Sequence, residues 1–141
     1  MAKKKTGKRG VLSEEKKREI ARKRRINKEI RRLEKIFENQ PEDIKAIADG
    51  LIKQAAYQRI QLEDYIVDLE QNGYVELFTQ SPKTPPYERE RPVARLYATA
   101  NRNYQTIMKQ LADLLPKQEQ KKVMAEDDGF SQFVQAKKVR E

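Results

Sequence analysis

The side chains with the clearest chemistry are arginines and lysines near the N-terminus, spaced as two rows on one predicted helix. The first row is Arg18, Arg22, Arg25 and Arg32, and the second is Lys17, Arg24, Lys28, Arg31 and Lys35. Cationic groups at helical spacing can lie along a phosphate backbone or enter a groove of a nucleic acid. The plainer alternative is a solvated charged face, shielded by Glu14, Glu15 and Glu19 through pairs along the helix.

The distribution of charge favours a polyanionic partner. Residues 1–35 contain 16 Lys or Arg and five Glu, a net charge of +11, whereas the remaining residues have a net charge of −2. A basic end on a nearly neutral body indicates nucleic acid first and an anionic membrane second. The basic helix lacks the Trp, Phe and Leu face that would enter a lipid headgroup layer, so we expect no membrane partner. The predicted DNA-binding residues are Lys3, Lys4, Lys5, Lys8, Arg9, Lys17, Arg18, Arg22, Lys23, Arg24, Arg25, Lys28, Arg31 and Arg32.

The same composition argues against catalysis. The chain has no Cys and no His, which removes thiolate nucleophiles, histidine bases and most zinc or haem sites, and which fits an intracellular protein. It contains no phosphate-binding glycine loop and no nucleophile elbow. The adjacent Asp127 and Asp128 do not make a metal cage. We therefore expect no enzyme activity, no metal and no cofactor.

Neither a membrane span nor a secretory signal is predicted. No apolar run approaches the roughly 18 residues that cross a bilayer. The lysines after Met1 are not followed by an apolar segment of the kind found in signal peptides.

The predicted fold is all-α, with one short β segment at residues 74–78. Residues 1–12 form a disordered basic tail, and residues 13–38 form a basic helix with Ser13 as its N-cap. The first half of this helix should project as a basic arm, while its second half should dock through Ile26, Ile30, Leu33 and Phe37.

Residues 39–116 should form a long helical hairpin with coiled-coil character. One helix runs from Pro41, at its first position, to Gln71, and Asn72-Gly73 ends it. A break at Gly50 is the alternative and would give a helix-turn-helix. Residues 74–78 form a strand or hairpin edge, and a stiff proline-containing connector follows. The second helix begins at Pro92 and stops before Pro116.

Both hairpin helices have apolar faces, and the first is wider than one neighbour requires. Their width predicts contact with another subunit as well as with each other. The predicted oligomerisation residues are Leu51, Leu62, Leu69, Leu96, Tyr97, Tyr104, Ile107 and Leu111.

Residues 117–141 form a flexible polar tail with one small apolar group. Phe130, Phe133 and Val134 have the spacing of one helical face. They predict a short motif that folds into a partner's groove, with folding back onto the chain's own body as the alternative.

The order of these segments resembles a known family. A basic N-terminus precedes EDIKAIADGLIKQAAYQRIQLEDYIVDLEQNGY, the proline-bearing loop TQSPKTPPYERERP, the helix VARLYATANRNYQTIMKQLADLL and the tail EDDGFSQFV. This pattern, over roughly residues 33–116 plus the tail, resembles the small terminase subunits of tailed bacteriophages. The family usually has Asn where this chain has Arg91, and often Gly-Leu where it has Leu114-Leu115-Pro116.

The resemblance implies a non-catalytic subunit that assembles as a ring in the cytoplasm of an infected bacterium. Such a subunit binds double-stranded viral DNA at the packaging start site and regulates the large subunit, which holds the ATPase and nuclease. The basic arm would bind DNA, and the Phe130 motif would dock the large subunit. The alternative function is a small basic accessory protein, chromosomal or RNA-binding, with no role in packaging.

Overall fold

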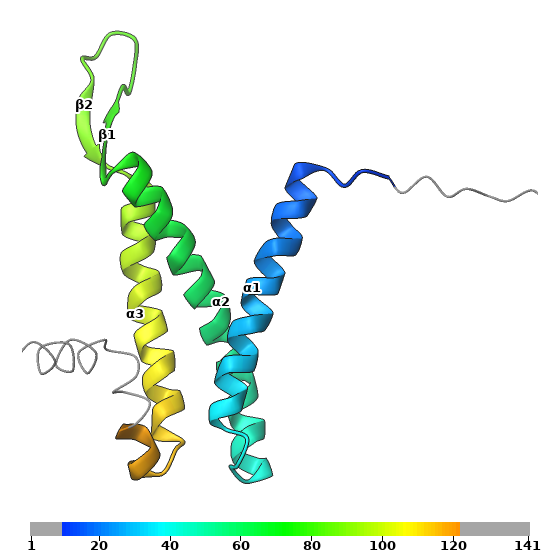
Figure 1. The fold of residues 1–141 in the computed structure, drawn as a ribbon. Helices are drawn as coiled ribbons and strands as arrows, with labels where there is room; N and C mark the ends of the chain where they lie inside the picture. The colour runs from blue at the N-terminus through cyan, green and yellow to red at the C-terminus, as the bar shows by residue number, and fades with distance from the viewer. Residues whose placement is uncertain (1–9, 122–141) are drawn as a thin grey trace, which may run out of the picture.

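The computed structural model describes residues 10–121 and contains three helices and a small β hairpin (Figure 1). The elements are α1 (Glu14–Ile36), α2 (Glu42–Asn72), β1 (Val75–Phe78), β2 (Tyr87–Glu90) and α3 (Pro92–Asp113). The predicted all-α fold class with a short β segment is confirmed, and the structure is mostly α with one small two-stranded sheet.

The basic helix begins where its cap residue predicts. The Ser13 hydroxyl accepts a hydrogen bond from the Lys16 backbone N–H at 3.3 Å, and Glu14 and Glu15 occupy the first turn. Both features favour a helix start, because they satisfy a free N–H and complement the helix dipole. The helix ends at Ile36, two residues before the predicted end at Glu38.

Helix α2 is continuous, so the helix-turn-helix alternative is wrong. Its 31 residues pass through Gly50 without interruption, because a glycine weakens a helix but does not break its hydrogen-bond ladder. Pro41 is the N-cap, one position before its predicted place. Gly73 ends the helix with a φ of 79°, which an L side chain rarely adopts.

The segment between α2 and α3 contains two strands where one was predicted. β1 pairs antiparallel with β2, with Val75 opposite Glu90 and Phe78 opposite Tyr87. On one face, Arg89 donates to Glu76 at 2.8 Å and its guanidinium lies 3.4 Å from the Phe78 ring centroid. The proline-containing connector is therefore the loop of a β hairpin.

An arginine joins α2 to α3 at the base of this hairpin. Arg91 Nη1 donates to the Gly73 carbonyl at 2.8 Å, and Arg91 Nη2 donates to Asp68 Oδ1 at 3.0 Å. Asn72 Nδ2 also donates to Asp68, at 2.5 Å. The hydrogen bond from Asn72, followed by that from Arg91, lowers the pKa of Asp68.

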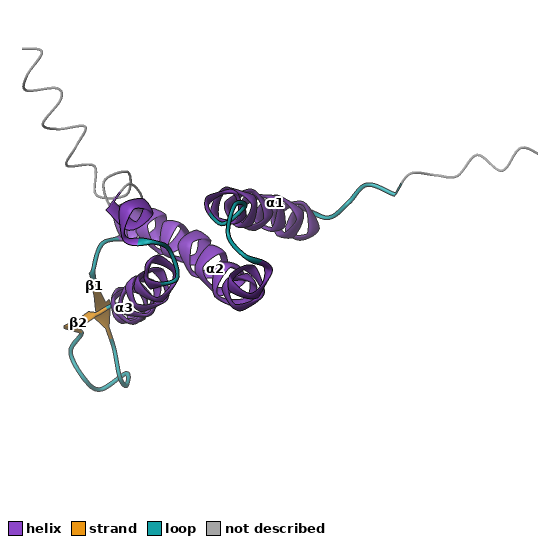
Figure 2. Ribbon diagram, turned by 90° about the horizontal axis from the view of Figure 1, so that it is seen from below, coloured by secondary structure: helices purple, strands orange, loops and turns teal. Residues whose placement is uncertain are grey.

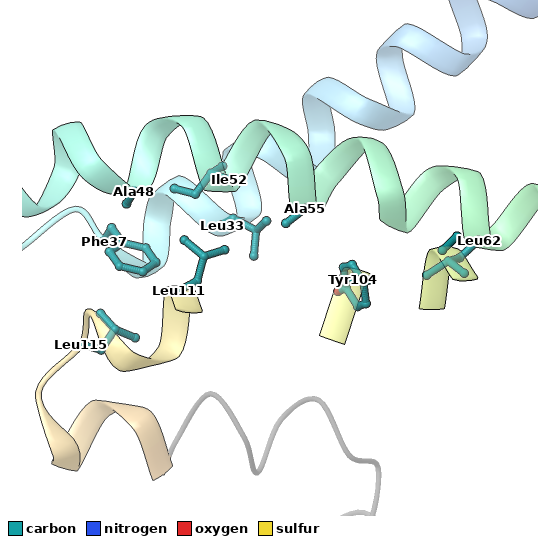
Figure 3. Close-up of a cluster of buried hydrophobic side chains, with 10 residues drawn as sticks. Leu33, Phe37, Ala48, Ile52, Ala55, Leu62, Tyr104, Leu111 and Leu115 are labelled. Carbon is teal, nitrogen blue, oxygen red and sulfur yellow. The ribbon is translucent and has the colours of Figure 1, made fainter. Parts of the chain in front are cut away.

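The core lies where the three helices converge. Figure 2 shows α2 between α1 and α3, and Figure 1 shows α1 and α2 separating from the turn that connects them. Alanines on α2 allow close approach of the neighbouring helices. The buried cluster, most of which Figure 3 shows, is Leu33, Phe37, Ala48, Ile52, Ala55, Leu62, Ala100, Tyr104, Leu111 and Leu115.

The described chain ends in a helical turn that lies beside the α1–α2 connection. Residues 117–121 are helical, and Gln40 Nε2 donates to Glu119 at 2.9 Å. The prediction placed these residues in a flexible tail. Their contact with Gln40 makes them part of the folded structure.

Candidate nucleic-acid interface

Helix α1 carries the predicted DNA-binding residues that fall within the described chain. Lys3, Lys4, Lys5, Lys8 and Arg9 lie outside it. The helix period separates most of the remaining basic side chains into two rows. The outward row lies opposite the core side chains of α1 and consists of Lys17, Arg24, Lys28, Arg31 and Lys35. The inward row, part of which contacts α2, consists of Arg18, Arg22, Arg25 and Arg32. The two rows have different surroundings and so can perform different roles.

The outward row consists of exposed side chains with few partners. Lys17 pairs with Glu14 at 2.7 Å, and Arg31 Nε donates to the Asn27 carbonyl at 3.3 Å. Within the described residues, no ion pair involves the other three members of the row, which are Arg24, Lys28 and Lys35.

The row is long enough to contact several phosphates. At a rise of about 1.5 Å per residue, Lys17 and Lys35 are about 27 Å apart along the axis. Duplex DNA carries about one negative charge per 1.7 Å of its length. Lys35 belongs to this row, although the predicted site ended at Arg32; its regular spacing was the signal that should have included it.

The inward row pairs with carboxylates. Arg25 donates to Asp64 Oδ1 at 2.6 Å and to Glu63 Oε2 at 2.8 Å, and Arg22 donates to Asp64 Oδ2 at 3.3 Å. The hydrogen bond to Asp64, followed by that to Glu63, raises the pKa of Arg25 above its ordinary value.

Two other basic side chains of α1 pair with glutamates of the same helix. Arg32 pairs with Glu29 at 2.7 Å, and Lys23 pairs with Glu19 at 3.2 Å. Arg18 is exposed. The shielding alternative therefore holds for part of α1, where glutamates of the same helix accept from the basic groups.

The first half of α1 was expected to project as a basic arm, and Figure 1 shows α1 diverging from α2 toward this end. The side chains that α1 gives to the core cluster begin at Ile30, and the predicted Ile26 is half-buried but outside that cluster. Arg22 and Arg25, however, connect the first half to α2 through Glu63 and Asp64. The predicted arm is thus held to the body by ion pairs.

A groove of about 550 Å³ runs between α1 and α2. Two carboxylates in its wall already have arginine partners, since Glu63 pairs with Arg25 and Glu29 pairs with Arg32. The remaining charge of the wall is positive, which suits an anionic ligand such as a phosphodiester. The lining residues are Arg25, Lys28, Glu29, Arg31, Arg32, Lys35, Ile60 and Glu63.

The predicted oligomerisation residues are mainly inside the protomer. Leu62, Leu69, Tyr104 and Leu111 are each less than 8% exposed. In this conformation they have little surface left for a neighbouring copy. Leu96 is 52% exposed, and the half-buried members of the set are Leu51, Tyr97 and Ile107.

Exposed apolar side chains gather at the hairpin end of the molecule. Val75 and Leu77 lie on the hairpin face opposite the Arg89–Phe78 contact, and Leu77 is 73% exposed. Val67 and Tyr74 are also at least half exposed. None of these four residues was predicted to lie in an interface.

The remaining predictions concern the C-terminal motif, metal binding and membrane spans. Phe130, Phe133 and Val134 lie outside the described residues, as do Asp127 and Asp128. Between residues 10 and 121, no group of three or more acidic, His or Cys side chains is arranged to hold a metal ion. None of the helices in this range is long and apolar enough to cross a membrane.

The chain matches no protein-family model, no curated protein and no solved structure.

Proposed function

We propose that this protein is a non-catalytic DNA-binding subunit of a phage terminase, which binds viral DNA for packaging and regulates the large ATPase and nuclease subunit. The observation that carries the DNA-binding part is the outward row of α1, an exposed cationic ridge with three members that lack ion pairs in the described structure. The terminase part rests on the resemblance in segment order.

Phosphate binding by the ridge follows from its position as well as its charge. The helix period places the ridge opposite the core side chains Leu33 and Phe37, so a duplex can approach without displacing the core. Lys28, Arg31 and Lys35 also reach the groove between α1 and α2. Neutralisation of phosphates by these groups would release counterions and make binding depend strongly on salt.

Substitution of three ridge residues tests this role. The Lys28→Gln, Arg31→Gln, Lys35→Gln variant should bind duplex DNA more weakly, and its plot of log affinity against log salt should be shallower by about one unit per lost phosphate contact. The matched control, Lys83→Gln, Arg102→Gln, Lys109→Gln, removes the same residue types from exposed positions in the hairpin loop and α3.

The control should retain the affinity and the salt slope of the wild type. Equal losses in the two variants would mean that only net charge matters, and unchanged binding in the first would remove the ridge from the interface. Arg22 and Arg25 are poor choices for this test, because their loss also breaks the contacts with Glu63 and Asp64.

Assembly into a ring is the second part of the proposal. The exposed apolar side chains at the hairpin end, including Leu77 and Leu96, offer a surface that association would bury. Light scattering should show a discrete oligomer of several subunits. A strict monomer at high concentration would argue against a terminase subunit.

The basic accessory protein is the second candidate, and the same ridge supports it. It predicts salt-dependent nucleic-acid binding without a ring and without an ATPase partner. A neighbouring gene for a Walker-type ATPase joined to a nuclease would favour the terminase. In that case, Phe130→Ala with Phe133→Ala should abolish stimulation of the large subunit while DNA binding and assembly persist.

A further inference from the structure

The contacts between Arg22 and Arg25 of α1 and the adjacent carboxylates of α2 have the chemistry of a phosphate site. Arg25 places its two terminal nitrogens 2.6 Å from Asp64 and 2.8 Å from Glu63, while Arg22 Nε lies 3.3 Å from Asp64. Guanidinium groups bind carboxylate and phosphate oxygens in the same forked geometry. These arginines thus already hold anionic oxygens in the free protein.

The same contacts hold the N-terminal part of α1 where the apolar core does not reach. No side chain before Ile30 belongs to the described core cluster. Figure 1 shows α1 and α2 diverging toward this end. Besides the ion pairs, the Arg22 guanidinium lies 5.2 Å from the Tyr57 ring centroid. Arg22 and Arg25 therefore give residues 14–29 a polar attachment to α2, next to the half-buried Ile20 and Ile26.

These ion pairs are accessible to a competing anion. The side chains of Arg25, Glu63 and Asp64 are 41–45% exposed, and that of Arg22 is 37% exposed. Exposed pairs contribute little to stability and weaken with salt. A dense array of phosphates can replace two carboxylates on such arginines without opening a buried core.

Glu63 and Asp64 also limit DNA binding in the resting arrangement, because they occupy cations that phosphates could use. Glu63 lies in the wall of the same groove as Lys28 and Arg32, where its pair with Arg25 leaves one cation fewer for a phosphate. Movement of α1 away from α2 would separate these pairs and expose Arg22 and Arg25 together. Both effects favour a separated α1 in the DNA-bound state.

We propose that Glu63 and Asp64 act as internal substitutes for phosphate: in the free protein they occupy Arg22 and Arg25, and a nucleic-acid backbone displaces them and releases residues 14–29 from α2. This inference rests on the proposed DNA-binding function. It assigns to the two carboxylates a regulatory role at that site and makes Arg22 and Arg25 contacts of the bound state only.

A distance measurement across α1 and α2 tests the release. The chain has no Cys, so Ala21→Cys and Gln71→Cys, both at exposed positions, give two unique sites for spin labels. Dilution with unlabelled protein suppresses distances between copies. We expect a narrow distance distribution in the free protein and a longer, broader one when duplex DNA is bound.

Neutral carboxylates should reproduce the DNA effect. The Glu63→Gln, Asp64→Asn variant should show the broad distribution without DNA and should bind DNA about three- to tenfold more tightly, as expected for losing weak competing pairs. Asp49→Asn with Glu70→Gln is the control, because it removes the same two residue types from exposed α2 positions with no ion pair to α1 in the described structure. It should leave the free distribution narrow.

The possible failures can be told apart. If wild-type protein binds DNA and the distance is unchanged, the release is wrong but the proposed function stands. If the Glu63→Gln, Asp64→Asn variant keeps the narrow distribution, the carboxylates do not hold α1, and the inference is wrong whatever DNA does. If wild-type protein binds no DNA, the proposed function is wrong, and so is the proposed displacement of Glu63 and Asp64 by phosphates.

Discussion

Arg91 and Asp68 are 23 residues apart in sequence, and they meet at 3.0 Å where α2, the hairpin and α3 converge. The Arg91 side chain is only 15% exposed, and it also donates to the Gly73 carbonyl. Arg91 immediately precedes α3, so its side chain links the start of α3 to the last turn of α2. No residue of the hairpin belongs to the buried cluster, so Arg91 supplies a polar contact between the helix ends that the hairpin itself does not provide.

Replacement of Arg91 should destabilise this joint. Arg91→Ala removes two hydrogen bonds and leaves the Gly73 carbonyl without its arginine donor, at a cost of about 1–3 kcal/mol in the free energy of unfolding. Urea denaturation followed by circular dichroism measures the change. Arg95→Ala is the control, since Arg95 is 83% exposed and its pair with Glu90 is 3.6 Å long. Equal stability of the two variants would contradict a structural role for Arg91.

The lowered pKa of Asp68 predicts an acid-dependent contribution to stability. Asn72 and Arg91 hydrogen-bond the ionised carboxylate, so its folded pKa lies below the ordinary value of 3.8. The contribution should be fully present above that value and should be lost as the pH falls through the lowered pKa. Between pH 7 and pH 2, the free energy of unfolding should therefore depend less on pH in Asp68→Asn than in the wild type. If the two proteins lose the same stability at low pH, Asp68 is not the source of the acid-dependent contribution.

Two glycines should respond in opposite ways to alanine. Gly50 lies inside α2, and an added Cβ would meet nothing within 4 Å, so Gly50→Ala should stabilise the protein by about 0.5–1 kcal/mol. Gly73 has a φ of 79°, and Gly73→Ala should destabilise it by about 1–3 kcal/mol. Thermal denaturation measures both. A loss of stability in Gly50→Ala would mean that α2 bends at this position in solution.

Two leucines of α3 should separate folding from assembly. Leu111 is 2% exposed and lies in the core, so Leu111→Ala should cost about 2–5 kcal/mol of stability. Leu96 is 52% exposed, and Leu96→Ala should change the stability of the protomer by no more than about 0.5 kcal/mol. If Leu96 lies in a subunit interface, sedimentation should show weaker association of this second variant. Normal association would exclude it from the interface.

Most of the helical structure follows from local sequence signals. Ser13 caps α1, Pro92 starts α3, and the prolines and Gly73 set the ends to within about two residues of prediction. β2 was missed because its sequence, YERE, has no apolar alternation. It forms because it pairs with β1 and because Arg89 contacts both Glu76 and Phe78.

The candidate site was only partly predictable for a similar reason. Helical spacing separates the basic residues into two rows, which the structure retains. It does not show which row meets carboxylates, because the partners of Arg25 are 38 and 39 residues away in sequence. Likewise, the apolar spacing identified Leu111 and Tyr104 as buried residues. It did not show that they are buried within one protomer and not between two.

The succession of α1, α2, β1, β2 and α3 has a kinetic consequence. In the described chain, the main packing partners are α1 with α2, α2 with α3, and β1 with β2, each pair made of neighbours in sequence. Such a topology has a low contact order, so little chain entropy is lost before contacts form. The protomer should therefore fold within microseconds to milliseconds, as helical bundles do, and should reach its folded form before it meets another copy or a nucleic acid.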